Sequence, residues 1–202
     1  MKMHFRLGLF LASLVLLSAC SLPHYQYRYE SEKAVDFRKG KWLINRIEAD
    51  LSLKSKALLT EKLLKEIRKL ATDSVVYVQN IQLGLLTPEQ LRFEPSEEIL
   101  NTLKNTTDFD FILNIRADKV RDDLSPILLY PMYSDAGNEV EIYIDIYNIA
   151  KAKRIYSQWI IASIAANENI ENVQFSFSAS GLIIQGLKKG IKRIKKHAIT
   201  SR

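Results

Sequence analysis

Alternation of apolar and polar residues over three stretches constrains the fold of this chain more than any other feature. The alternation covers residues 109–116 and 139–146, and it continues in 155–161 beyond a turn at 151–154. A period of two residues is typical of a β-strand that has one face on a hydrophobic core and the other partly in water. The three stretches therefore predict an antiparallel meander of three strands.

Helical periodicity flanks this meander on both sides. Leucine or isoleucine recurs every three or four residues in 53–71 and again in 178–198, as in amphipathic helices. Shorter helices are predicted after Thr87-Pro88, which begins a capping box with proline at the first helical position, and after Pro95-Ser96. The sequence thus predicts an α+β fold, in which a mixed or antiparallel sheet contains the meander and helices, including a C-terminal one, pack on it.

The first nineteen residues have the composition of a secretory signal. Lys2 and Arg6 precede an apolar run from Leu7 to Leu17, which is followed by the small residues Ser18 and Ala19. A basic start, a short apolar core and small residues before a cleavage point define such signals. The run is well short of the ~20 residues that a membrane-spanning helix needs.

Cys20 makes this signal more specific. The sequence Leu17-Ser18-Ala19-Cys20 resembles the lipobox of bacterial lipoproteins. The resemblance implies that the Cys20 thiol is diacylated, that the chain is cut before Cys20 and that the new amine is acylated. These fatty-acyl chains, such as palmitate, would bind the protein to the membrane. Two or more acyl chains give stable anchoring. Ser21 is not the aspartate that favours inner-membrane retention, which points to the outer membrane, facing the periplasm. The alternative is an ordinary signal peptide with an incidental cysteine.

The remaining chain is expected to form one domain. Residues 1–19 are assigned to the signal, 20–37 to a lipidated tether, and 38–202 to a single α+β domain with a basic C-terminal helix. Within the tether, Tyr25, Tyr27 and Tyr29 alternate with polar residues, which is the period of a strand. Two interpretations stay open for this piece: a strand added to the edge of the sheet, or a mobile tether.

The formal net charge of +6 is concentrated in the C-terminal helix. This helix carries six cations that could bind an anionic lipid or envelope polymer: Lys188, Lys189, Lys192, Arg193, Lys195 and Lys196. The alternative is a solvated helix face whose cations suit the helix C-terminus. The spacing of Gly181, Gly186 and Gly190 would allow the opposite face to pack closely on the sheet.

The connection between the first two strands of the meander is unusually apolar for a loop. Exposed apolar patches tend to mark interaction sites, so a partner contact is predicted for Ile127, Leu128, Leu129, Tyr130, Met132 and Tyr133. The alternative is that this segment folds back and covers the sheet.

The sequence offers few residues in an arrangement typical of catalytic sites. The histidines His4, His24 and His197 fall in the signal, the tether and the tail, which disfavours a Ser-His-Asp triad or a histidine metal site. Carboxylates such as Asp110 and Glu141 could face each other as in glycosidases, but alternating acids more often form the solvated face of a strand. The sequence predicts no enzyme, no cofactor, no metal, no small-molecule substrate and no nucleic acid partner.

Two longer stretches carry a resemblance of pattern to known domains. The sequences DFDFILNIRADKV and EVEIYIDIYNIAKAKRIYSQWIIASI are similar to strands of small periplasmic lipoprotein domains. Examples are the peptidoglycan-synthase activator lipoproteins, the curli-secretion lipoprotein and the amino-terminal domain of the Tol system's propeller protein. The resemblance implies a mixed sheet with packed helices and a role in binding envelope proteins. We therefore expect a membrane-anchored, non-enzymatic protein-binding or assembly module, the alternative being a lipid- or polymer-binding module.

Overall fold

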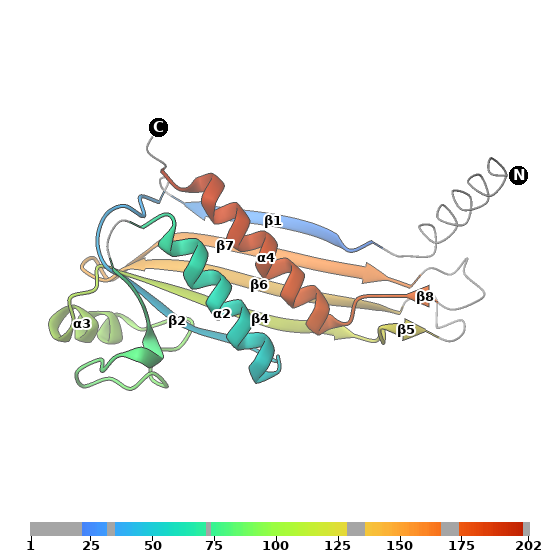
Figure 1. The fold of residues 1–202 in the computed structure, drawn as a ribbon, viewed down its shortest axis with the longest axis horizontal. Helices are drawn as coiled ribbons and strands as arrows, with labels where there is room; N and C mark the ends of the chain where they lie inside the picture. The colour runs from blue at the N-terminus through green and yellow to red at the C-terminus, as the bar shows by residue number, and fades with distance from the viewer. Residues whose placement is uncertain (1–21, 32–34, 72–73, 129–135, 167–173, 200–202) are drawn as a thin grey trace, which may run out of the picture.

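The computed structural model describes residues 22–31, 35–71, 74–128, 136–166 and 174–199. Its centre is a six-stranded sheet, and a separate pair of short strands, β5 and β8, lies at one end (Figure 1). The strand order in the main sheet is β1-β7-β6-β4-β2-β3. The strands are β1 His24–Ser31, β2 Trp42–Ala49, β3 Val75–Tyr77, β4 Phe111–Asp122, β5 Ile127–Leu128, β6 Gly137–Asn148, β7 Lys153–Ala165 and β8 Gln174–Phe175.

The sheet is mixed, and it contains the expected meander. Strands β4, β6 and β7 are antiparallel neighbours that follow one another along the chain. Strand β2 pairs in parallel with both β3 and β4, and β1 pairs antiparallel with β7 along all eight of its residues. The predicted α+β class, with helices packed on a mixed sheet and a C-terminal helix, is confirmed.

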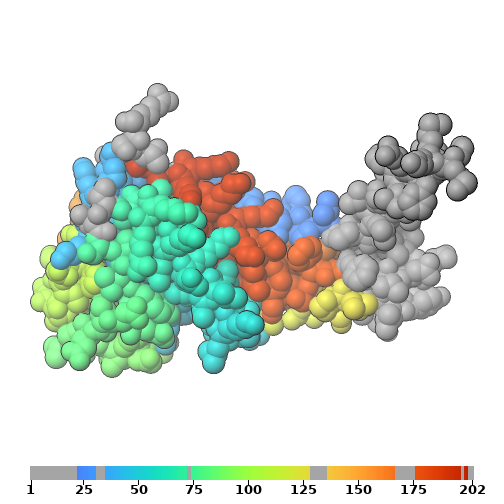
Figure 2. All heavy atoms as spheres, viewed as in Figure 1, coloured from blue at the N-terminus to red at the C-terminus, as the bar shows by residue number. Residues whose placement is uncertain are grey.

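Two helices cover one face of this sheet, and both begin at a serine cap. The hydroxyl oxygens of Ser52 and Ser178 accept hydrogen bonds from backbone amides in the first turns of α2 and α4, which satisfies donors that a helix start leaves unpaired. The two helices lie next to each other across the near face (Figures 1 and 2). The helices are α2 Leu53–Arg68, α3 Glu97–Thr106, α4 Ala179–His197 and the 3₁₀ turn η1 Val78–Asn80.

Glycine allows α4 to approach the sheet closely at two positions. A Cβ atom on Gly186 would lie 2.3 Å from Cδ1 of Ile142, and one on Gly190 would lie 2.8 Å from Cδ1 of both Ile144 and Ile160. Real Cβ atoms do not come so near to other carbons, so the sheet and helix interlock here. Gly181 meets nothing closer than 3.4 Å. Of the three glycines expected to permit close packing, two do so.

The other face of the sheet is only partly covered. The main hydrophobic core lies between the sheet and α2 and α4. On the other face, the segment from η1 through α3 packs over one end, where Leu43 and Ile112 join a second hydrophobic cluster. The short helix expected after Thr87-Pro88 is not formed; the chain makes a turn instead. The capping bond from the Thr87 amide to Gln90 Oε1 does exist, at 2.7 Å. The chain then extends, because two buried strand asparagines hold its carbonyls: Asn45 Nδ2 donates to Leu91 O (2.8 Å) and Asn114 Nδ2 to Phe93 O (2.7 Å).

The tyrosine-rich segment forms an edge strand of the sheet. Of the two interpretations left open for it, the structure supports the strand, β1, whose three tyrosines face α4. Cys20 and residues 1–19 lie outside the described residues, so the signal, the lipobox and the domain boundaries stay predictions. None of the helices within the described ranges is long and apolar enough to cross a membrane.

Candidate functional site

A row of aromatic rings and guanidinium groups crosses the uncovered part of the second sheet face. Arg116 on β4, Tyr143 on β6, Trp159 on β7 and Arg28 on β1 stand directly opposite one another in the strand register. Because alternate residues of a strand point to the same face, the four side chains share the face opposite α2 and α4. We call these four residues the cation–aromatic row.

The geometry of the cation–aromatic row is that of a continuous stack. The rings of Tyr143 and Trp159 lie 5.9 Å apart and almost parallel, at 7°. The guanidinium carbon of Arg28 is 4.7 Å from the Trp159 ring centre, and that of Arg116 is 4.9 Å from the ring centres of Tyr143 and Phe93. Cation–π contacts of this kind are worth about 0.5–2 kcal/mol each, depending on burial. The row is therefore held in one arrangement before any partner binds.

A groove of about 280 Å³ adjoins the row, and a buried carboxylate forms part of its wall. The side chain of Asp145 is only 2% exposed; it accepts hydrogen bonds from Ser157 Oγ (2.6 Å) and from Arg154 Nη1 (3.2 Å). The pKa of Asp145 is raised above its ordinary value, because the effect of burial outweighs the opposing effects of Ser157 and Arg154. Arg154 also reaches Glu30 of β1 at 3.2 Å. This ion-pair network joins β1, β6 and β7 and shapes the groove.

The carboxylates considered for hydrolysis are committed to other contacts. Asp110 Oδ2 accepts a hydrogen bond from the Lys41 amide (2.8 Å), and Glu141 contacts the Tyr143 hydroxyl. Asp118 stands opposite Glu141 on the uncovered face, but it pairs with Arg116 at 3.0 Å. Neither Glu141 nor Asp118 lines the groove described above or the pocket described next. This arrangement fits a solvated strand face better than an acid–base pair around a substrate.

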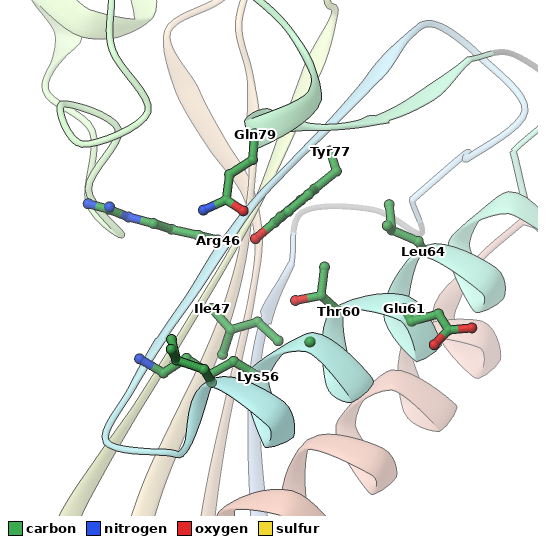
Figure 3. A pocket seen from close by; sticks show the side chains of 10 residues that line it. Arg46, Ile47, Lys56, Thr60, Glu61, Leu64, Tyr77 and Gln79 are labelled. Carbon is green, nitrogen blue, oxygen red and sulfur yellow. The ribbon is translucent and has the colours of Figure 1, made fainter.

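A larger pocket, of about 520 Å³, lies between α2 and the outer edge of β2 (Figure 3). It exists because β3 pairs only with the first three residues of β2 and the chain then leaves the sheet as η1. Tyr77 and Gln79 form one side of the pocket, and Thr60 and Glu61 of α2 form another. Arg46 at its rim donates a hydrogen bond to the Glu89 carbonyl (3.3 Å). The lining offers no pairing of a nucleophile with a base.

The basic face of α4 is partly engaged within the domain. Lys189 lies 3.9 Å above the ring centre of Tyr25, and Arg193 lies 3.5 Å above that of Tyr27 and donates a hydrogen bond to the Tyr29 hydroxyl (2.9 Å). Lys195 forms an ion pair with Glu66 of α2. Three of the six cations predicted to bind an anionic surface thus hold β1 and α2 to α4. The others are Lys188, which is half-buried, and Lys192 and Lys196, which are exposed.

The apolar connection is described only at its start. Ile127 and Leu128 form β5, which pairs with β8, and Ile127 is 54% exposed. The remaining predicted contact residues lie outside the described residues: Leu129, Tyr130, Met132 and Tyr133. Within the described ranges, no three His, Cys, Asp or Glu side chains gather closely enough to hold a metal ion.

The sequence matches no family model and no curated protein. Among solved structures, PelC, a dodecamer from Paraburkholderia phytofirmans, is 9% identical with a TM-score of 0.44, covering 88% of this chain and 100% of PelC. The hypothetical protein CT253 from Chlamydia trachomatis is 10% identical with a TM-score of 0.44, covering 79% and 97% of the two chains. Lipoprotein GNA1162 from Neisseria meningitidis is 13% identical with a TM-score of 0.32, covering 78% and 99%. At TM-scores below 0.5, these likenesses carry no argument about function.

Proposed function

We propose that this chain is a lipid-anchored protein of the bacterial envelope whose domain binds another protein through the uncovered sheet face. The cation–aromatic row is the observation that carries this proposal. Tryptophan, tyrosine and arginine are the residue types that dominate the energetics of protein–protein interfaces. Here they lie in register on the part of this face that is not covered by η1 and α3. The role proposed is binding without catalysis.

The dimensions of the row suit the centre of an interface. Four neighbouring strands spaced about 4.8 Å apart place its ends roughly 15 Å from each other. A standard interface buries about 800 Å² on each partner and concentrates its binding energy in a small central cluster. Because the row is already ordered by its own stacking, little side-chain freedom remains to be lost when a partner binds.

The anchor would hold the domain close to the membrane. Cys20 is four residues before His24, the first residue of β1, so the connection spans at most about 14 Å. The apolar β5 lies at the end of the sheet where β1 begins (Figure 1). In this proposal that end faces the membrane, at the periplasmic side of the outer membrane, and the row points sideways toward a neighbouring envelope protein.

Isolation of the tagged full-length chain from solubilised membranes tests the partner. We compare the wild type with Trp159→Ala and with a control, Leu58→Ala, which changes a 58% exposed residue on α2. We expect one envelope protein to accompany the wild type and the control, and its recovery to fall at least about tenfold for Trp159→Ala, the loss expected when an interface anchor worth 1.4 kcal/mol or more is removed. Equal recovery with all three chains would contradict the proposed face.

The anchor has a separate test. Cys20→Ser removes the only thiol of the chain, so the variant should leave the membrane fraction, while the wild type should stay there through washing with high salt. Membrane attachment of Cys20→Ser equal to that of the wild type would contradict lipidation without bearing on the binding face.

A further inference from the structure

Strand β1 ends the sheet with an edge to which no strand of the described ranges pairs. It pairs with β7 over eight consecutive residues without a bulge. Native proteins usually protect a long, regular edge by shortening it, bulging it or placing proline within it. Residues 24–31 show none of these three devices, although Pro23 stands just before them. Charged side chains also protect an edge, and this one carries Arg28 and Glu30, so a strand that pairs here has to accommodate both charges.

The sequence of β1 is complementary to itself when it is read backwards. With Tyr27 opposite Tyr27 of a second copy, antiparallel pairing sets His24 against Glu30, Tyr25 against Tyr29, and Gln26 against Arg28. No two like charges meet in this register, the imidazole faces a carboxylate, and three tyrosine pairs form a ladder on the α4 face. Such cross-strand pairs are the units that stabilise a sheet.

Symmetry leaves few other registers. Two residues that pair across antiparallel strands point to the same face of the sheet, so a residue cannot pair with its own sequence neighbour in the second copy. The two-fold axis between identical strands therefore passes through a position where a residue stands opposite itself. An axis at Arg28 would set two guanidinium groups against each other. An axis at Tyr29 would pair only five residues within 24–31, whereas the axis at Tyr27 pairs seven. Charge and length thus favour the same register.

We propose that the β1 edge is a self-association surface, at which two copies of this chain pair β1 with β1 antiparallel, about an axis at Tyr27, into one continuous sheet. The exposed Arg28 then keeps its contact with Trp159 (4.7 Å) and gains the amide of Gln26 from the second copy. This proposal depends neither on lipidation nor on the partner of the cation–aromatic row.

Only the C-terminal half of α4 lies near the pairing edge. α4 crosses the sheet obliquely: its first residue is tied to Asp122 on β4, while Arg193 near its end reaches Tyr27 on β1. In the dimer, the start of each α4 therefore lies far from the paired β1 strands. The pairing brings two Arg193 side chains toward the axis, where each keeps its hydrogen bond to the Tyr29 hydroxyl of its own copy (2.9 Å).

A series of cysteine variants measures the register in membranes that contain the full-length chain. Opposed residues at Tyr27 would have Cα atoms about 4.5–5.5 Å apart, within the range of a disulfide. Tyr27→Cys alone should form a disulfide-linked dimer under mild oxidation. Tyr25→Cys or Tyr29→Cys alone should not, because each residue lies about 13 Å along the strand from its own copy. The double variant Tyr25→Cys/Tyr29→Cys should crosslink again.

Control variants separate specific pairing from random collision. The wild type, whose only cysteine is Cys20, sets the background. Equal yields from Tyr25→Cys and Tyr27→Cys would indicate random collision and overturn the proposal, and a yield confined to Tyr29→Cys would overturn the register. If the variants do not fold, the mass of the unmodified chain in detergent micelles decides: a dimer supports the proposal, and a monomer at every concentration overturns it.

Discussion

Replacing Gly190 with alanine tests how tightly α4 is seated on the sheet. Alanine in the middle of a helix is favoured over glycine by about 1 kcal/mol. At Gly190, however, the added Cβ would lie 2.8 Å from Cδ1 of two buried side chains on different strands, Ile144 and Ile160. Overpacking of a well-filled core costs about 1–3 kcal/mol. We therefore expect Gly190→Ala to lower the free energy of unfolding by about 1 kcal/mol, the difference between these two effects.

Gly181→Ala is the matched control in the same helix. Its new Cβ would meet only atoms at ordinary van der Waals distances of 3.4 Å or more, so we expect a gain of up to about 1 kcal/mol from helix propensity. Urea unfolding of both variants measures the difference. A second substitution, Ile144→Val, removes one of the two crowded methyl groups and should cost less in the Gly190→Ala background than in the wild type. If Gly190→Ala is as stable as Gly181→Ala, the close approach of α4 is wrong.

Three further predictions follow from ion pairs and from the edge strand. Hydrogen bonds from Lys195 and Lys69 lower the pKa of Glu66 to about 2, so the stability that this carboxylate contributes is present above its ordinary pKa of 4.5 and is lost as the pH falls toward 2. Urea unfolding should show this loss, and Glu66→Gln should reduce its slope with pH. Arg193→Met removes the cation above Tyr27 and should speed hydrogen exchange of the β1 amides but not of the β6 amides. Burial raises the pKa of Asp145, so its ionisation destabilises the folded state progressively as the pH rises above the ordinary value near 3.8, and this loss is complete above the folded pKa. A titration of its carboxyl carbon signal by NMR should give a midpoint above 3.8.

The helices and strands were predicted from the sequence more accurately than the tertiary contacts around them. Period-two alternation located β4, β6 and β7, and helical spacing located α2 and α4, because burial of one face imposes those periods. The turn after Thr87-Pro88 was missed because its helix signal is local, whereas Asn45 and Asn114, distant in sequence, hold the following segment extended. Tertiary hydrogen bonds overrode the local preference.

The cation–aromatic row was also missed, and no single stretch of sequence could have shown it. Its four members come from four strands, and only the register of the sheet places Arg116, Tyr143, Trp159 and Arg28 in line. Once the strand order is known, the row can be recognised, because β6 and β7 are neighbours and each places an aromatic residue on the face opposite the helices. Asp145 falls in the alternating stretch 139–146, where acids are expected on a solvated strand face, yet its side chain is buried in the groove wall.

Photocrosslinking in intact cells is the most direct test of the proposed binding face. A photoreactive amino acid replaces Ile161, which is half-buried on the uncovered face of β7 beside Trp159, and in a second chain it replaces Lys62, which is exposed on α2. We predict that Ile161 yields one main adduct with a different envelope protein, that Lys62 does not, and that adding Trp159→Ala abolishes the adduct while the chain stays folded. Absence of an adduct at Ile161, or the same adducts from both positions, would show that the face around Trp159 is not the binding face.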